Sequence, residues 1–331
     1  MEWVLSITII FLCYLFCFTN GFNDAANIIA LPVVTRVISP FLGLFLACIF
    51  EFIGCYFLGE LVLKTILKDI IDFSFLQSNL YKFLFSILFV ASSWGIVCTI
   101  LGFPISSSHT LIGALLGGAI GAKGFYVIKW INILKIVLFL ILAPILSLFF
   151  CYLLTKIVYF IFLNSDKKVS KFFEVLQIFS LCFFALAHGS NNGKKIVGLF
   201  YFCLLVLGFY KAEEVLPQWV LLSCAIVISC GVFLGGKNVI KTVGMKIYKL
   251  KQWQAAISQF GSSLLLYLGS CLGIPLSSTH LIVGSVIGSG LSYKTKCVRW
   301  NFGLGIFLVW ILTLPLSVIL SYFVFNIVKF L

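Results

Sequence analysis

The chain has 331 residues, of which 62% are hydrophobic and only 10% are charged, and its mean hydropathy is +1.18. This composition excludes a soluble globular protein, in which about 45–50% of residues are apolar and about 25% are charged. The formal net charge of +13 does not indicate nucleic-acid binding, because the basic residues lie in short loops between apolar segments and form no single patch. We therefore expect a membrane protein with no nucleic-acid partner.

Apolar runs long enough to span a bilayer recur along the chain. A run of roughly 17–25 mostly apolar residues crosses a membrane as a helix. In chain order the predicted spans are 3–19, 41–63, 83–101, 133–155, 172–187, 196–209, 219–235, 256–272 and 302–327. The runs 111–121 and 281–291 are too short to span alone, and we interpret them as half-helices or arms of re-entrant hairpins. The expected fold is an all-α polytopic membrane protein.

Two polar motifs, each present twice, interrupt the apolar sequence. Residues 20–27 read NGFNDAAN and residues 188–195 read HGSNNGKK, while residues 102–109 read GFPISSSH and residues 273–280 read GIPLSSTH. Because the two pairs have nearly equal offsets, the chain is interpreted as a duplicated unit. We expect broken helices or re-entrant hairpins to carry these motifs. Matching interruptions in two halves are typical of the substrate site of a transporter.

The charges of the loops predict that the two repeats are inverted. The loop 236–251 holds five lysines and no acid, and the loop 164–171 is also rich in lysine, so both are expected to be cytoplasmic. The loop 64–82, which is equivalent to 236–251, has nearly balanced charges and is expected outside. We therefore predict a first inverted repeat at 1–163, a central cytoplasmic loop at 164–171 and a second inverted repeat at 172–331.

The first motif offers ligands for a cation. Asp24 directly follows the first predicted span and is flanked by Asn23 and Asn27. An ionised carboxylate at membrane depth costs at least a few kcal/mol unless it is paired or coordinated, and amide oxygens suit Na⁺. We interpret Asn23, Asp24, Asn27 and Asn191 as a cation-binding set for Na⁺ or H⁺. The alternative is an interfacial aspartate that caps a helix.

The second motif offers ligands for an oxyanion. Each copy places three consecutive hydroxyls before a new apolar helix, whose free N–H groups and positive dipole end favour an anion. The predicted substrate-binding residues are Ser106, Ser107, Ser108, Ser277, Ser278 and Thr279, together with Asn192 and Lys195. The alternative is that these hydroxyls only pack and cap helices.

The three histidines, His109, His188 and His280, all lie in the motifs. We interpret them as groups that hold the motif loops in shape, with a proton-carrying role as the alternative. Glu51 and Glu60 lie within the second predicted span, and Glu51 is the deeper of the two. The 12 cysteines include no Cys-x-x-Cys pair, so we expect no cofactor and no metal other than Na⁺.

Together the motifs resemble those of the inorganic phosphate transporter (PiT) family, in its compact bacterial form. The similar features are Gly-x-Asn-Asp-x-Ala-Asn near the amino terminus, the paired Pro-x-Ser-Ser/Thr-Ser/Thr-His motifs, TRVISP at 35–40 and GGKNVIKTVG at 235–244. The resemblance implies inverted repeats, phosphate that enters with Na⁺ or H⁺, a homodimer, and a multi-pass location in the bacterial inner membrane. It also associates both motifs with the substrate and cation sites.

The second copy of the first motif differs from the family pattern. Asn192 stands where the family has aspartate, and Lys194 stands where an uncharged amide is usual. The local charge therefore differs from that of the family, and this difference concerns which coupling cation is bound and how many. We expect a secondary active transporter that imports inorganic phosphate by cation symport with alternating access. A sulfate permease of the same family and an anion channel are the alternatives. We expect no enzyme, because Ser108 and His109 are adjacent and no Gly-x-Ser-x-Gly or His-Glu-x-x-His motif is present.

Overall fold

The computed structural model describes residues 2–58, 79–162, 167–211, 216–235, 239–240, 242–274, 276–293 and 298–330. These residues form α-helices and no β-strand. The α-helices are α1 (Glu2–Val34), α2 (Pro40–Leu58), α4 (Leu80–Leu101), α5 (Ser107–Lys123), α6 (Trp130–Ile161), α7 (Lys167–Val206), α8 (Gln218–Leu234), α10 (Gln252–Cys271), α11 (Ser278–Tyr293) and α12 (Trp300–Lys329). A short 3₁₀ helix, η3, covers Phe125–Val127, and a π-helical turn, η4, covers Thr242–Lys246.

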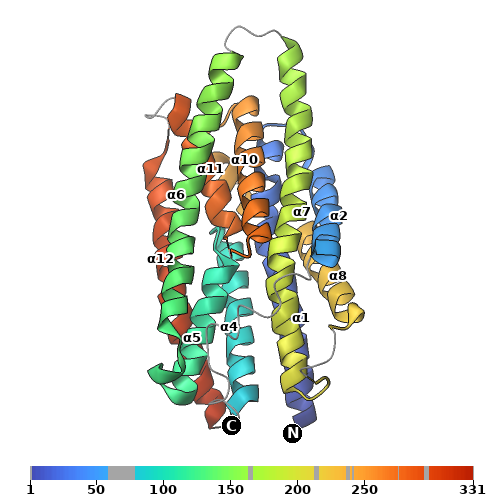
Figure 1. Ribbon diagram of the computed structural model, residues 1–331, viewed down its shortest axis with the longest axis vertical. Helices are drawn as coiled ribbons and strands as arrows, with labels where there is room; N and C mark the ends of the chain where they lie inside the picture. Colours follow the sequence, from blue (N-terminus) through green and yellow to red (C-terminus); the bar gives the residue numbers. More distant parts are fainter. Residues whose placement is uncertain are drawn as a thin grey trace.

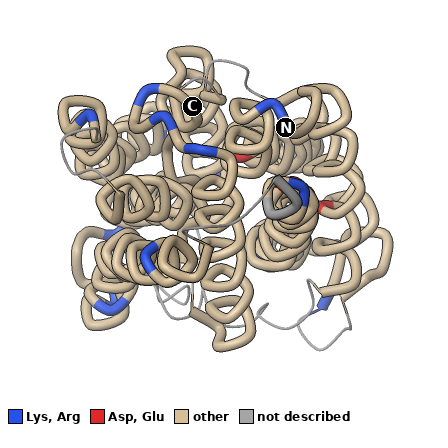
Figure 2. Tube along the Cα trace, turned by 90° about the horizontal axis from the view of Figure 1, so that it is seen from above, with Lys and Arg blue, Asp and Glu red and all other residues tan. Residues whose placement is uncertain are grey.

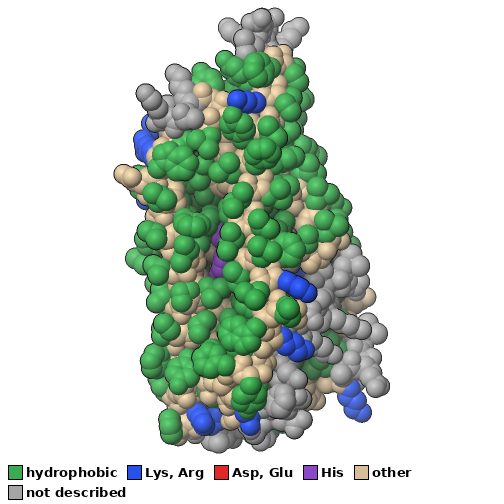
Figure 3. Space-filling model, turned by 60° about the vertical axis from the view of Figure 1, so that its left-hand side comes forward, with side chains coloured by type: hydrophobic (Ala, Val, Ile, Leu, Met, Phe, Trp, Pro, Cys, Tyr) green, Lys and Arg blue, Asp and Glu red, His purple; other side chains and the backbone are tan. Residues whose placement is uncertain are grey.

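Six of the described helices are long and apolar enough to cross a membrane, namely α1, α2, α4, α6, α7 and α12. Their outer surface is mostly hydrophobic (Figure 3), and large apolar side chains of α6 and α12 such as Phe160 and Leu308 are more than half exposed. Seen along the bundle, the Lys and Arg positions of the described residues are scattered over several helices and do not gather over one of them (Figure 2). The expectation of an all-α polytopic membrane protein is confirmed.

The first motif does not break the helices that carry it, contrary to the expectation of broken helices there. α1 continues from Glu2 to Val34 through residues 20–27, and α7 continues from Lys167 to Val206, so the predicted spans 172–187 and 196–209 are one helix. The helices persist because the buried polar side chains of the motif find partners on other elements, which leaves the backbone free to keep its own hydrogen bonds. The predicted loop 164–171 is correspondingly shorter, because α7 begins at Lys167.

The second motif lies at the turn of a helical hairpin in both halves, as predicted. α4 and α5 form one hairpin, α10 and α11 form the other, and the predicted half-helices 111–121 and 281–291 lie within α5 and α11. Gly102 and Gly273 end the first arms with φ angles of 78° and 69°, a left-handed conformation that favours glycine at a helix C-terminus. Pro275, Glu60 and parts of the loops 64–82 and 236–251 lie outside the described residues.

The hairpins enter from opposite ends of the molecule and meet near its middle. α4 and α5 lie in the half that contains both chain termini, whereas α10 and α11 lie in the other half, where α6 ends and α7 begins (Figure 1). α5 packs against α12, and α11 packs against α6. The two hairpins therefore place their turns at the centre, beside the polar segments of α1 and α7.

Small residues allow the short helices to pack closely against the long ones. Side chains added at Gly113 and Gly117 of α5 would meet backbone carbonyls of α12, and side chains added at Gly284 and Gly288 of α11 would meet backbone carbonyls of α6. Such rows of small residues are a usual device for helix packing in membranes. The duplicated glycines therefore have duplicated structural roles.

Candidate functional site

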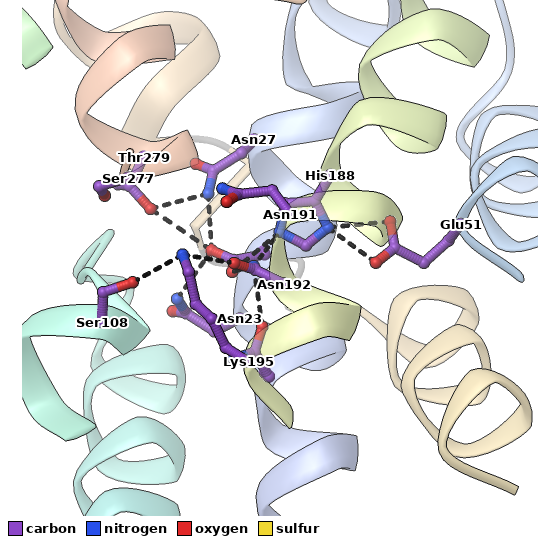
Figure 4. Close-up of polar contacts among 12 residues, drawn as sticks. Asn23, Asn27, Glu51, Ser108, His188, Asn191, Asn192, Lys195, Ser277 and Thr279 are labelled. Carbon is purple, nitrogen blue, oxygen red and sulfur yellow. Dashed lines mark hydrogen bonds and ion pairs between the residues drawn. The ribbon is translucent and has the colours of Figure 1, made fainter. Parts of the chain in front are cut away.

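The predicted site residues come together where the two hairpin turns meet α1 and α7 (Figure 4). α1 supplies the first asparagine–aspartate motif, α7 supplies its second copy, and the N-termini of α5 and α11 supply the hydroxyls. Nearly all of these side chains are buried, with Ser107 and Lys195 partly exposed. The residues of the two predicted sets therefore lie in one polar cluster inside an apolar protein.

Asp24 is the central acceptor of the cluster, and its side chain is only 1% exposed. Its Oδ1 accepts hydrogen bonds from Asn27 Nδ2 at 2.8 Å, Asn23 Nδ2 at 3.3 Å and Thr279 Oγ1 at 3.4 Å. Its Oδ2 accepts one from Asn192 Nδ2 at 3.1 Å and lies 3.1 Å from His188 Nε2. Donors from α1, α7 and α11 thus converge on one carboxylate, which is the compensation that a buried charge requires.

His188 links Asp24 to a second buried carboxylate, that of Glu51 on α2. His188 Nδ1 lies 2.8 Å from both Oε1 and Oε2 of Glu51, and both side chains are fully buried. When both carboxylates are ionised, an imidazolium that donates from both ring nitrogens is the form that pairs with each of them. The sequence singled out Glu51 by its depth in an apolar span, but the sequence-predicted binding sets include neither Glu51 nor His188.

The two copies of the first motif make equivalent contacts with the hairpin turns. Asn23 Nδ2 donates to the carbonyl oxygen of Ile105 at 3.1 Å, and its counterpart Asn191 donates to that of Leu276 at 2.9 Å. Asn27 and Lys195 are also counterparts, and each reaches the hairpin of the other half. Asn27 Nδ2 lies 2.9 Å from Thr279 Oγ1, and Lys195 Nζ lies 3.1 Å from Ser108 Oγ.

Position 195 breaks this symmetry, because Lys195 provides an ammonium group where Asn27 provides an amide. Lys195 Nζ also donates to Asn192 Oδ1 at 3.3 Å and to the carbonyl oxygen of Leu276 at 3.4 Å. Lys194 points elsewhere, toward the hydroxyl and carbonyl oxygens of Ser270 at 3.0 and 3.4 Å. Only the second of the two lysines therefore belongs to the central cluster.

The six hydroxyls of the second motif have three different structural roles. Ser106 and Ser277 each accept a hydrogen bond at 3.4 Å from the backbone N–H three residues later, as N-caps do. Ser108 and Thr279 are bonded to side chains of α7 and α1. The side chains of Ser107 and Ser278 have no hydrogen-bond partner among the described residues.

A small cavity adjoins the cluster on the side of the first hairpin. Its volume of ≈ 10 Å³ is enough for about one water molecule. Ser107 lines it together with Phe16, Thr19, Asn20, Asn23, Ala91, Gly95, Ile105 and Thr110. This cavity is too small for a tetrahedral oxyanion, so such an anion does not fit in it without movement of the residues that line it.

The cluster offers chemistry for both a cation and an anion. Asn27 Oδ1 is buried beside Asp24 without a hydrogen-bond donor among the described residues, and this oxygen and the carboxylate are ligands that suit a hard cation. The hydroxyls of Ser107 and Ser278 lie at the N-terminal ends of α5 and α11 and suit an anion, and the Lys195 ammonium group contacts the neighbouring Ser108. Opposite charges can thus be bound side by side.

Comparisons with known proteins identify similar chains. The model of the phosphate transporter family matches residues 20–321. Two similar proteins are named "Probable low-affinity inorganic phosphate transporter". The one from Rhizobium meliloti (strain 1021) is 34% identical over 97% of this chain and 96% of its own length. The one from Bacillus subtilis (strain 168) is 34% identical over 98% of each chain.

A solved structure titled "The sodium-dependent phosphate transporter" has the same fold. It superposes with a TM-score of 0.90 and covers 99% of this chain and 100% of its own, at 24% sequence identity. The similarity confirms the helical membrane architecture. The relatives are transporters, not enzymes, as the sequence predicted.

Proposed function

The chain belongs to the phosphate transporter family, and from this premise we propose that it imports inorganic phosphate together with a cation by alternating access. The observation that carries the proposal is the position of Asp24. Its buried carboxylate lies where both hairpin turns meet, and Thr279 Oγ1 of the second hairpin lies 3.4 Å from Asp24 Oδ1 and 2.9 Å from the carbonyl oxygen of Ile105 in the first hairpin. A cation that neutralises Asp24 therefore acts on the same hairpin turns that would hold the substrate.

The cation is assigned to Asp24 and the asparagines around it. Asp24 supplies the charge, Asn27 Oδ1 supplies an oxygen without a competing donor, and Asn23 and Asn191 anchor α1 and α7 to the hairpin turns. Na⁺ fits this set of oxygen ligands, and the similar solved structure carries the name of a sodium-dependent transporter. We assign Na⁺ as the coupling ion on these two grounds.

Phosphate is assigned to the space between the two hydroxyl triplets. The unpartnered hydroxyls of Ser107 and Ser278 donate to its oxygens, and Lys195 provides a fixed positive charge. Ser106 and Ser277 shape the helix ends, while Ser108 and Thr279 tie the hairpins to Lys195 and Asp24. Asn192 joins the two regions, because it donates to Asp24 and accepts from Lys195.

Alternating access would use the two predicted inverted repeats, 1–163 and 172–331, and the segment 164–171 that joins them is partly helical, because α7 begins at Lys167. The paired contacts of Asn23 and Asn191, and the hairpins that enter from opposite ends, support this symmetry (Figure 1). Exchange of the two hairpin conformations would open the central site first to one side and then to the other. The small cavity beside Ser107 is consistent with a closed central site.

Uptake of radiolabelled phosphate into proteoliposomes tests the proposal, with the Na⁺ and pH gradients imposed independently and sulfate added as a competitor. We expect accumulation above the external concentration when Na⁺ is directed inward, and no inhibition by equimolar sulfate. Competition by sulfate would identify a sulfate permease. Phosphate flux that neither saturates nor concentrates would identify an anion channel.

A further inference from the structure

His109 and His280, the last residues of the two serine motifs, lie against each other between the hairpins. Their ring centroids are 4.8 Å apart, and the side chains are 8% and 2% exposed. A histidine is visible in a narrow hollow of the hydrophobic face (Figure 3), whereas His188 is completely buried. Neither ring takes part in the contacts assigned above to phosphate or to the cation.

Each ring of the pair keeps a nitrogen without a partner. His280 Nδ1 donates to the carbonyl oxygen of Leu140 on α6 at 3.0 Å, and its ring packs 3.9 Å from that of Trp310 on α12. His280 Nε2 and His109 Nδ1 are buried without a hydrogen-bond partner among the described residues. A buried polar atom of this kind is rare, and two in contacting imidazoles provide nitrogens that can accept a proton without breaking an existing hydrogen bond.

The surroundings of the pair provide no negative charge of their own. The helices α4, α5, α6, α10, α11 and α12, which form and enclose the hairpins, contain no aspartate or glutamate. Their charged side chains are Lys82, Lys123, Lys135, Lys156 and Lys329. Two charged groups of the central cluster lie nearby. Lys195 of α7 contacts Ser108, which precedes His109 in the sequence, and Asp24 of α1 contacts Thr279, which precedes His280. Because Asp24 already accepts from several donors, a proton on the pair has no free counter-charge.

A bound oxyanion would supply that counter-charge. Ser107 and Ser108 directly precede His109, and Ser278 and Thr279 directly precede His280. An anion held by the hydroxyls of both triplets therefore lies within a few residues of both rings, in a region where charges interact strongly because water is scarce. Binding of the anion then favours a proton on the rings, and a proton on the rings favours the anion by the same factor.

We propose that phosphate binding draws a proton onto the His109–His280 pair, so that one H⁺ accompanies each phosphate in addition to the cation at Asp24. The inference rests on the proposed phosphate site and adds a second ion site that is distinct from Asp24.

Calorimetric titration of inorganic phosphate into the purified protein tests this proposal. Titrations at one pH in two buffers of different ionisation enthalpy give the protons taken up per phosphate bound, and the matched variant is His109→Gln/His280→Gln. The ionisation of phosphate itself contributes equally in both proteins and cancels in the comparison. We expect the native protein to take up at least about 0.5 proton more per phosphate than the variant, and its affinity to change more steeply with pH, by up to about tenfold per unit.

Equal proton uptake in both proteins would overturn the inference while leaving phosphate transport intact. An absence of phosphate binding by the native protein would instead overturn the proposed function on which the inference rests. His109→Gln alone decides the question if the double variant does not fold, because the unpartnered His109 Nδ1 makes no bond that the substitution would break.

Discussion

Replacing Ser107 and Ser278 together by alanine tests which hydroxyls bind the substrate. Neither side chain has a hydrogen-bond partner among the described residues, so their loss leaves no internal group unsatisfied. Each hydrogen bond to a charged partner is worth about 1.5–3 kcal/mol. Since every 1.4 kcal/mol is a factor of ten, the double variant should bind phosphate about 10²–10⁴ times more weakly. Its thermal stability should be nearly unchanged.

Ser106→Ala/Ser277→Ala provides the matched control, because it removes the same number of hydroxyls from the same two turns. These serines accept from backbone N–H groups of His109 and His280, and the loss of an N-cap costs about 0.5–2 kcal/mol of stability. The control should therefore unfold at a lower temperature and keep most of its phosphate affinity. Phosphate binding by calorimetry and thermal unfolding are measured for both variants. Native affinity in Ser107→Ala/Ser278→Ala would refute the assignment and leave these hydroxyls as packing groups.

Three further substitutions probe the cation site and the fold. Asn192→Asp places a second carboxylate beside Asp24 Oδ2, so the Hill slope of phosphate uptake against Na⁺ concentration should rise. An unchanged slope with the same driving ion would place position 192 outside the cation site. Glu51→Gln keeps the shape of the side chain but removes the charge that pairs with His188. Phosphate uptake should therefore fall at least about tenfold, while thermal unfolding should show that the fold is retained. Uptake at the native level would make Glu51 a structural residue only. Gly284→Ala should lower the free energy of unfolding by about 1–3 kcal/mol, because its new methyl group meets the Pro144 carbonyl of α6. Gly305→Ala is the control, because a methyl group added there meets open space, and it should not lower that free energy. Equal unfolding temperatures of the two variants would contradict the packing account.

The hairpins and the hydroxyl site could be predicted from the sequence because their signals are local. A glycine and a proline precede three hydroxyls in each copy, and the helix that follows is too short to span a bilayer. The expected break at the first motif was wrong for a reason that is not local. Asn27 bonds to Thr279, which lies 252 residues further along the chain, and no spacing in the sequence reveals such a partner.

The same limit explains why the full environment of Asp24 could not be predicted. Glu51 was visible as an acid in an apolar span, but its partner His188 lies 137 residues away on a different helix. The adjacent lysines Lys194 and Lys195 look alike in sequence, and only the packing of α7 shows that one faces Ser270 and the other faces Ser108. The direction in which a side chain points on a continuous helix depends on the neighbouring helices.

The most direct test of the central claim is concentrative phosphate uptake by Asp24→Asn in proteoliposomes with an inward Na⁺ gradient. Asp24 is the only acid in either copy of the asparagine–aspartate motif, and asparagine preserves its size while removing its charge. We predict that the native protein accumulates phosphate and that Asp24→Asn, folded and reconstituted to the same density, does not. Accumulation by Asp24→Asn at the native level would show that the driving cation binds elsewhere and would contradict the account.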